Sequence, residues 1–116
     1  MALQVIGRKS CKETQKALRF FKERGLTPQY VDLDQRALSP GELENIFQHV
    51  PPDEALDETS KQFKKRNLAY LAYDPREELE EDQGLLKTPI VRFKGKATAG
   101  VALETWKVWA NQAKEG

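Results

Sequence analysis

The sequence predicts an α/β protein in which helices pack on a small mixed sheet, with the element order β-α-β, an all-helical middle, then β-β-α. Two observations predict this class. The opening strand–helix–strand unit favours a parallel strand pair joined by a right-handed crossover. The closing pair of strands is separated by a hairpin-turn signal. We expect a single domain over 1–116, with a core made of 1–35 and 86–116 and a helical insertion over 36–85.

The first third of the chain carries the strand–helix–strand unit. Apolar residues at 3–6 and 29–33 predict the two strands. Ser10, followed three residues later by Glu13, forms a capping-box pattern and predicts that the helix starts at Ser10. Gly25 predicts the end of that helix, because glycine is favoured just past a helix C-terminus.

The middle of the chain predicts three helices. Ser39 begins the first, with Glu42 completing a second capping box, and Pro51 ends it. The second helix is predicted over 54–65. The third is predicted over 74–82, where a run of acidic residues is expected to form a solvated face.

The last third returns to strands. Residues 89–93 and 96–99 predict two strands on either side of Lys94-Gly95, which is a hairpin signal. A final helix is predicted from about Ala102. Its apolar stripe includes Trp106, which we expect in the core.

Composition excludes several classes of function. The chain is 39% hydrophobic and 32% charged, and its net charge is +1, so no global field favours a membrane surface or nucleic acid as a partner. No apolar run has the roughly 20 residues that cross a bilayer, and no signal-peptide pattern is present, so we expect a cytoplasmic protein. One cysteine and one histidine cannot form a structural zinc site, and we expect no bound cofactor.

Cys11 is the candidate reactive residue. It follows a predicted strand directly and lies in the first turn of a predicted helix, where free backbone amides and the helix dipole favour an anion. Arg8, Lys9 and Lys12 add positive charge around the same turn. Both effects favour the thiolate, which is the nucleophilic form of cysteine. The alternative is an inert, buried cysteine that acts as a small apolar residue.

Three basic residues are candidates for binding an anionic substrate. Lys65, Arg66 and Arg92 could reach a site above Cys11 if the middle helices fold over it. Arginine is the preferred partner of an oxyanion because its guanidinium binds in a bidentate way. The alternative is that each of them is an ordinary solvated surface charge.

Two segments carry a resemblance to a known family. The segment 7–17, GRKSCKETQKA, resembles the active-site segment of the arsenate reductase (ArsC) family, including its Spx and YffB branches. The segment 87–100, KTPIVRFKGKATAG, resembles that family's pattern of K-x-P, a short strand, G-K and a later glycine. The resemblance implies a thioredoxin/glutaredoxin-like fold with a helical insertion.

The resemblance also implies roles for individual residues. Cys11 would be the redox nucleophile, and Pro89 would be a cis-proline beside it. Thr88 would supply backbone groups for a thiol substrate. Lys12 and Thr14, which follow Cys11 in the same segment, are further candidates for substrate binding.

Several positions depart from the arsenate-reducing pattern. The arginine that precedes the proline in that branch is replaced by Thr88, and no arginine occurs within 97–100, where another is expected. Lys65 and Arg66 are the nearest matches to a third. We therefore expect arsenate reduction to be weak or absent. Thr14 stands where many Spx-type members have the second cysteine of C-x-x-C, so Cys11 has no partner within the chain.

The leading functional hypothesis is a monothiol thiol–disulfide oxidoreductase that uses glutathione or a similar small thiol as co-substrate. Its nucleophile would be Cys11, its substrate a small thiol compound or oxyanion, and its partner could include a glutaredoxin. The first alternative is a non-catalytic, Spx-like regulator that binds RNA polymerase through its surface. The second is a stabilised relic without a redox role.

We predict that glutathione disulfide forms a single stable adduct at Cys11, because no second thiol in the chain can displace it. Intact-mass measurement should show one glutathione on the native protein and none on Cys11→Ser, and excess thiol should remove it. If the native protein stays unmodified at concentrations that modify an exposed model thiol, Cys11 is buried and inert.

Overall fold

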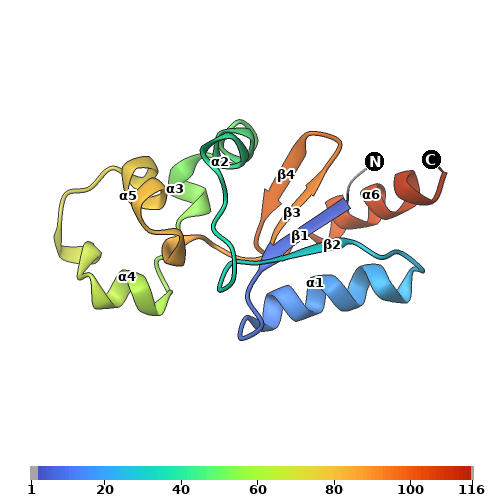
Figure 1. The fold of residues 1–116 in the computed structure, drawn as a ribbon, viewed down its shortest axis with the longest axis horizontal. Helices are drawn as coiled ribbons and strands as arrows, with labels where there is room; N and C mark the ends of the chain where they lie inside the picture. The colour runs from blue at the N-terminus through green and yellow to red at the C-terminus, as the bar shows by residue number, and fades with distance from the viewer. Residues whose placement is uncertain (1–2, 116) are drawn as a thin grey trace.

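A four-stranded mixed sheet with helices against both faces forms one half of the molecule, and a group of short helices forms the other half (Figure 1). The computed structural model describes residues 3–115. Its elements, in chain order, are β1 (Leu3–Gly7), α1 (Lys12–Glu23), β2 (Gln29–Asp32), α2 (Pro40–Phe47), α3 (Pro52–Ala55), α4 (Lys61–Lys65), the 3-10 helix η1 (Leu68–Tyr70), α5 (Pro75–Glu81), the 3-10 helix η2 (Gln83–Leu85), β3 (Ile90–Phe93), β4 (Lys96–Ala99) and α6 (Leu103–Glu115).

The sheet has the strand order β2-β1-β3-β4. β1 and β2 are parallel, and α1 connects them, as the strand–helix–strand pattern predicts. β3 is antiparallel to both β1 and β4, and a turn at Lys94 and Gly95 closes the predicted hairpin. The predicted α/β class and element order are therefore confirmed.

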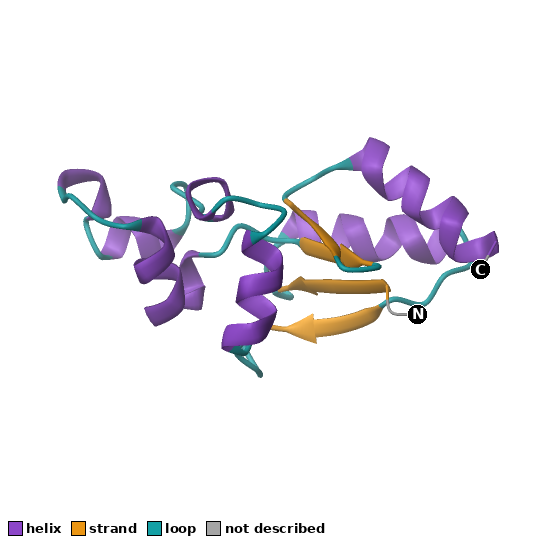
Figure 2. Cartoon of the chain, turned by 90° about the horizontal axis from the view of Figure 1, so that it is seen from above, coloured by secondary structure: helices purple, strands orange, loops and turns teal. Residues whose placement is uncertain are grey.

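The two faces of the sheet support two separate apolar cores. Val5 and Val91 lie in register on the face that α1 and α6 cover, together with Trp106, which is fully buried. Ile6 and Ile90 lie in register on the opposite face and join the core of the middle helices. This division follows from the period of two along a strand, which sends successive side chains to opposite faces. Figure 2 shows the strands and the two longest helices in one half of the molecule and the short helices in the other.

The first helix of the insertion begins with the predicted capping box. The hydroxyl of Ser39 accepts a hydrogen bond from the backbone N–H of Glu42 at 3.2 Å. The backbone N–H of Ser39 donates in return to Oε1 of Glu42 at 2.9 Å. The same carboxylate also accepts two hydrogen bonds of 3.0 Å from Arg36, so one side chain ties the helix start to the preceding loop.

The predicted start of α1 at Ser10 is wrong. Cys11 is the N-cap residue, with the extended backbone that this position needs, and no side chain caps the helix. The chain first makes a tight turn in which the N–H of Cys11 donates to the carbonyl of Arg8 at 3.1 Å. Ser10 is held inside that turn, so its hydroxyl does not serve as the cap.

The single helix predicted over 54–65 is also wrong. The segment forms two short helices, α3 and α4, separated by an extended residue, Leu56, and a turn. Leu56 forms an antiparallel bridge with Leu86, which competes with helical hydrogen bonding. Ser60 then starts α4 by accepting a hydrogen bond from the N–H of Phe63 at 3.1 Å. The acidic helix α5 ends at Glu81, slightly earlier than predicted.

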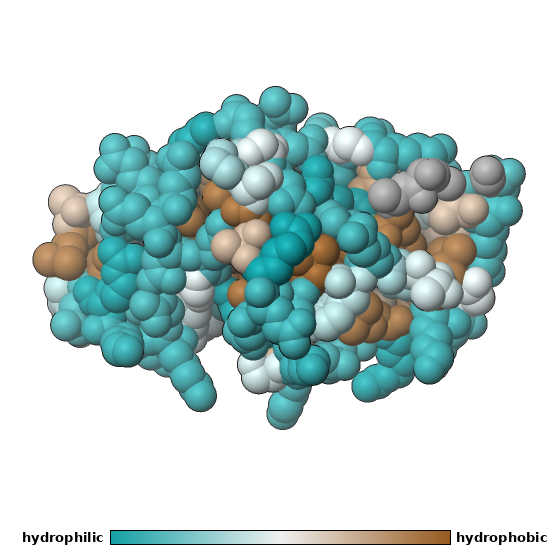
Figure 3. Space-filling view, viewed as in Figure 1, coloured by the Kyte–Doolittle hydropathy of each residue, from teal (hydrophilic) through white to brown (hydrophobic). Residues whose placement is uncertain are grey.

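The face shown in Figure 3 is largely hydrophilic, with apolar side chains scattered over it. The described residues include exposed apolar side chains at the far end of the insertion, where Tyr70 and Leu71 lie. Among residues 3–115, no helix has both the length and the apolar character that crossing a membrane requires.

The contact between Arg36 and Glu42 makes stability dependent on pH. Hydrogen bonds from Arg36 lower the pKa of Glu42 to about 2, against the opposing effect of partial burial. A carboxyl group whose pKa is lowered on folding stabilises the protein above its unfolded value of about 4.3, and this stabilisation is lost as the pH falls towards 2.

We therefore predict that Glu42→Gln lowers the free energy of unfolding at pH 7 by about 1–2 kcal/mol, since the partner Arg36 is half-exposed. Denaturant unfolding should show this difference shrinking between pH 4.5 and pH 2. Glu23→Gln, which removes an exposed carboxylate, should change stability by less than about 0.5 kcal/mol. An equal loss for Glu42→Gln at pH 7 and at low pH would show that charge is not the cause.

Candidate functional site

Cys11 and Thr88 meet at one end of the sheet. β1 leads into the turn before Cys11, and β3 begins two residues after Thr88. Because β1 and β3 are antiparallel, the end of one lies beside the start of the other. Residues that are 77 positions apart in the sequence are thereby brought into direct contact.

The junction between β1 and α1 is closely packed. An added Cβ atom at Gly7 would lie 2.9 Å from Cβ of Thr14, so only glycine fits there. Thr14 is fully buried, and its hydroxyl has no hydrogen-bond partner among the described residues. Thr14 therefore supports the position of the helix beneath Cys11 and does not face a substrate.

The sulfur of Cys11 has three polar neighbours. The hydroxyl of Thr88 donates a hydrogen bond to Sγ at 3.1 Å. The carbonyl oxygen of Thr88 lies 3.7 Å from Sγ, and Oε2 of Glu13 lies 3.5 Å from it, as acceptors for the thiol proton. The Thr88-Pro89 peptide bond is cis, which confirms the prediction for Pro89.

Opposing electrostatic effects act on Cys11. Its position as N-cap of the twelve-residue helix α1 places the sulfur near the positive end of the helix dipole. The donated hydrogen bond from Thr88 also stabilises a thiolate. The carboxylate of Glu13 acts in the opposite direction, because a negative charge 3.5 Å away repels a thiolate.

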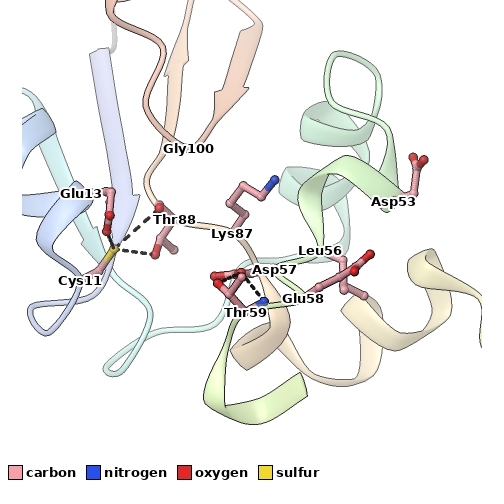
Figure 4. Close-up of a pocket in the computed structure, with 10 residues that line it drawn as sticks. All are labelled: Cys11, Glu13, Asp53, Leu56, Asp57, Glu58, Thr59, Lys87, Thr88 and Gly100. Atoms are coloured by element: carbon pink, nitrogen blue, oxygen red, sulfur yellow. Dashed lines mark hydrogen bonds between the residues drawn. The ribbon is translucent and has the colours of Figure 1, made fainter. Parts of the chain in front are cut away.

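A cavity of about 460 Å³ opens beside the sulfur. It is lined by Cys11, Glu13, Asp53, Leu56, Asp57, Glu58, Thr59, Lys87, Thr88 and Gly100. Cys11 and Glu13 lie on one side of this pocket, and Asp57, Glu58 and Thr59 lie on the other, with Lys87 between them (Figure 4). The size suits a small molecule or a few residues of a peptide.

The far side of the pocket is held by backbone pairing with the segment before β3. The N–H of Asp57 donates to the carbonyl of Leu85 at 2.8 Å, and the N–H of Lys87 donates to the carbonyl of Ala55 at 2.7 Å. Asp57 is further ordered by accepting hydrogen bonds from the N–H and hydroxyl of Thr59, at 2.9 and 2.6 Å. These contacts place the loop after α3 opposite Cys11.

The guanidinium of Arg8 ties the Cys11 turn to the same segment. It donates to the carbonyl of Gln83 at 2.6 Å and to that of Leu86 at 3.4 Å. Arg8 does not line the pocket, and its donors are used by backbone carbonyls. Arg8 therefore stabilises the turn before Cys11 and does not contact a substrate in the pocket.

Two of the three basic residues predicted to bind an anion, Arg66 and Lys65, lie in the insertion and away from the pocket. Arg66 binds Glu78 through two hydrogen bonds of 2.7 and 2.8 Å and contacts Asp82 at 3.4 Å. Lys65, which is exposed at the end of α4, does not line the pocket. The middle helices do not bring these two side chains over Cys11.

Arg92 is held in the sheet and also lies outside the pocket. Its guanidinium donates to the side-chain oxygen of Asn45 at 2.8 and 3.1 Å and to that of Gln4 at 2.9 Å. Lys12 is exposed on α1 and does not line the pocket. Among the basic residues of 3–115, only Lys87 lines it.

The phenol of Tyr30 is partly buried near several acidic groups, which include Cys11. Burial raises the pKa of Tyr30, and the negative charges of Asp32, Asp34 and Cys11 raise it further. Its phenol therefore stays protonated at neutral pH and offers no base. Its hydroxyl has no hydrogen-bond partner among the described residues.

Neither a protein-family model nor a curated protein matches this sequence. Solved structures do match. Arsenate reductase from Vibrio cholerae is 19% identical with a TM-score of 0.77, over 94% of this chain and 98% of that one. An arsenate reductase (ArsC) related protein from Brucella melitensis is 20% identical with a TM-score of 0.68, over 94% of each chain. The YffB protein is 15% identical with a TM-score of 0.81, over 94% of this chain and 99% of that one.

The chain has the thioredoxin-like ArsC fold. The fold predicted from the two resembling segments is thereby confirmed. Within this fold, the pocket of the present chain is formed by the strand ends that carry Cys11 and Thr88 and by the helical insertion.

The residues that sequence reasoning missed are the carboxylates of the pocket. Asp57 and Glu58 lie inside the segment 54–65, which is predicted to be one continuous helix, and Asp53 directly precedes it, so the sequence does not mark them as a pocket lining. Glu13 was interpreted only as part of a cap. The single sequence signal for the pocket wall is the run of turn-forming residues at 57–60, which could have indicated a break in the helix.

No group of three or more histidine, cysteine, aspartate or glutamate side chains within 3–115 is arranged to hold a metal ion. The carboxylates of the pocket are spread over opposite sides and do not converge on one point (Figure 4). The arrangement is suited to reactions at the Cys11 sulfur.

We predict that Thr88→Val slows alkylation of Cys11 by iodoacetamide at pH 7 by about 3-fold, because the thiolate loses a stabilising hydrogen bond and a smaller fraction of Cys11 is ionised. The higher nucleophilicity of a less stabilised thiolate offsets part of this loss. Thr88→Ser keeps the hydroxyl and should react like the native protein. If the valine and serine variants react equally fast, the hydroxyl does not stabilise the thiolate.

Proposed function

We propose that this protein is a monothiol thiol–disulfide oxidoreductase with Cys11 as its nucleophile. The Cys11 thiolate attacks one sulfur of a disulfide, so that a new S–S bond forms as the substrate's S–S bond breaks. The other half of the substrate leaves as a thiolate and takes a proton from water. An external thiolate then attacks the sulfur bound to Cys11, which regenerates the Cys11 thiolate and releases a new disulfide.

One observation carries the proposal: the Cys11 sulfur lies at the wall of an open cavity, at a helix N-terminus, and accepts a hydrogen bond of 3.1 Å from Thr88. An inert cysteine that only fills space would be enclosed by apolar side chains. Here the sulfur is partly exposed and its neighbours are polar.

The resolving thiol must come from outside the chain, because the sequence contains one cysteine. Glutathione is the co-substrate that we propose first, since the cavity beside Cys11 has a volume that suits a small molecule. A glutaredoxin could serve the same purpose by removing a glutathione adduct.

The pocket is less suited to arsenate than to a disulfide. Its lining contains four carboxylates and one lysine, whereas an oxyanion is stabilised by charge-assisted donors, most often arginine. The two arginines predicted to bind an anion contact other side chains: Arg66 forms an ion pair with Glu78, and Arg92 donates a hydrogen bond to Asn45. We therefore propose disulfide exchange as the reaction, with arsenate reduction weak or absent.

A thiol-coupled assay with two substrates tests the proposal. We predict turnover of hydroxyethyl disulfide in the presence of glutathione, complete loss of turnover in Cys11→Ser, and arsenate turnover near the background of that variant. Turnover of arsenate comparable to that of the disulfide would contradict the assignment. Absence of any turnover, together with co-purification of RNA polymerase subunits, would favour the regulator hypothesis instead.

A further inference from the structure

We infer that the pocket beside Cys11 selects small disulfides that carry a positive charge near the reacting sulfurs. This inference rests on the proposed function and names its substrate class: disulfides of amine-bearing thiols. The observation behind it is the charge of the pocket lining.

The lining is strongly acidic. Carboxylates line the pocket on both sides, with Oε2 of Glu13 3.5 Å from the sulfur on one side and Asp57 and Glu58 across the cavity (Figure 4). Asp53 adds a fourth carboxylate at the outer end of that far side. Lys87 is the single cation in the lining of the described pocket, so negative charge dominates.

These carboxylates are available to a substrate. Within residues 3–115, none of the four takes part in an ion pair with a lysine or arginine. Glu13, Asp53 and Glu58 are exposed. Asp57 accepts hydrogen bonds from Thr59, which leave its charge in place. An ammonium group that enters the cavity would therefore meet unneutralised negative charge.

The nearby cations do not reverse this balance. Arg8 is bound to the carbonyls of Gln83 and Leu86 and lies outside the lining. Lys12 is exposed on α1 and also lies outside it. A substrate in the cavity would therefore contact the carboxylates of the lining and not these two side chains.

The carboxylates of the pocket lining should change the rate at which the Cys11 thiolate attacks the substrate disulfide. A cationic disulfide is attracted to the pocket, whereas an anionic one is repelled before its sulfur reaches Cys11. Each half of glutathione disulfide carries two carboxylates and one ammonium, so this disulfide is net negative and should form its adduct more slowly than a cationic disulfide. A small amine-bearing disulfide should react fastest.

Three disulfides of similar size separate charge from reactivity: cystamine is cationic, hydroxyethyl disulfide is neutral, and 3,3′-dithiodipropionate is anionic. The rate of adduct formation at Cys11 is measured by intact mass and divided by the rate with free 2-mercaptoethanol, which corrects for the intrinsic reactivity of each disulfide. We expect the corrected rate for cystamine to exceed that for dithiodipropionate by about 10-fold at low salt. The preference should fall as the ionic strength rises to about 0.5 M.

Matched variants test whether the wall is the cause. Asp53→Asn combined with Glu58→Gln removes two charges from the lining, and we expect it to reduce the cystamine preference by about 3-fold or more. Glu54→Gln combined with Glu81→Gln removes two exposed charges from α3 and α5 outside the lining and should leave the preference unchanged.

The possible outcomes are distinct. Loss of preference in the pocket variant alone supports the inference. Equal loss in both variants, or no preference in the native protein, overturns it while the proposed function stands, provided that hydroxyethyl disulfide still modifies Cys11. If no disulfide modifies Cys11, the proposed function itself fails, and the inference fails with it.

Discussion

Two backbone hydrogen bonds join the loop after α3 to the segment before β3, and the site depends on them. The N–H of Asp57 donates to the carbonyl of Leu85, and the N–H of Lys87 donates to that of Ala55. This short pairing interrupts what would otherwise be one helix and turns the loop after α3 towards Cys11. Without it the cavity would have no far wall.

The sheet places Cys11 independently of that pairing. β1 and β3 are antiparallel, so the end of β1 and the start of β3 coincide, and Cys11 comes to lie against Thr88. Side chains alternate along both strands, which gives each face its own apolar core. The core under α1 supports the turn that carries Cys11, and Gly7 allows that helix to pack directly against the strand.

The sheet with α1 and the helical insertion contribute different groups to the pocket. The sheet and α1 provide a thiol at a helix start, with a hydroxyl donor beside it, which is what nucleophilic attack on a disulfide needs. The insertion provides charge: its carboxylates line the cavity, while Arg66 of the insertion pairs with Glu78 and Asp82.

Local patterns in the sequence were sufficient to predict the strands, most of the helices, the place of Cys11 between a strand and a helix and, through the family resemblance, the cis bond before Pro89. Such features depend on residues a few positions apart. The break within 54–65 and the acidic wall could not be predicted, because they result from pairing between Leu56 and Leu86, thirty residues apart. The tertiary structure alone decided which charges face the sulfur, since a charged side chain is stable either in water or beside a partner, and only packing selects between the two.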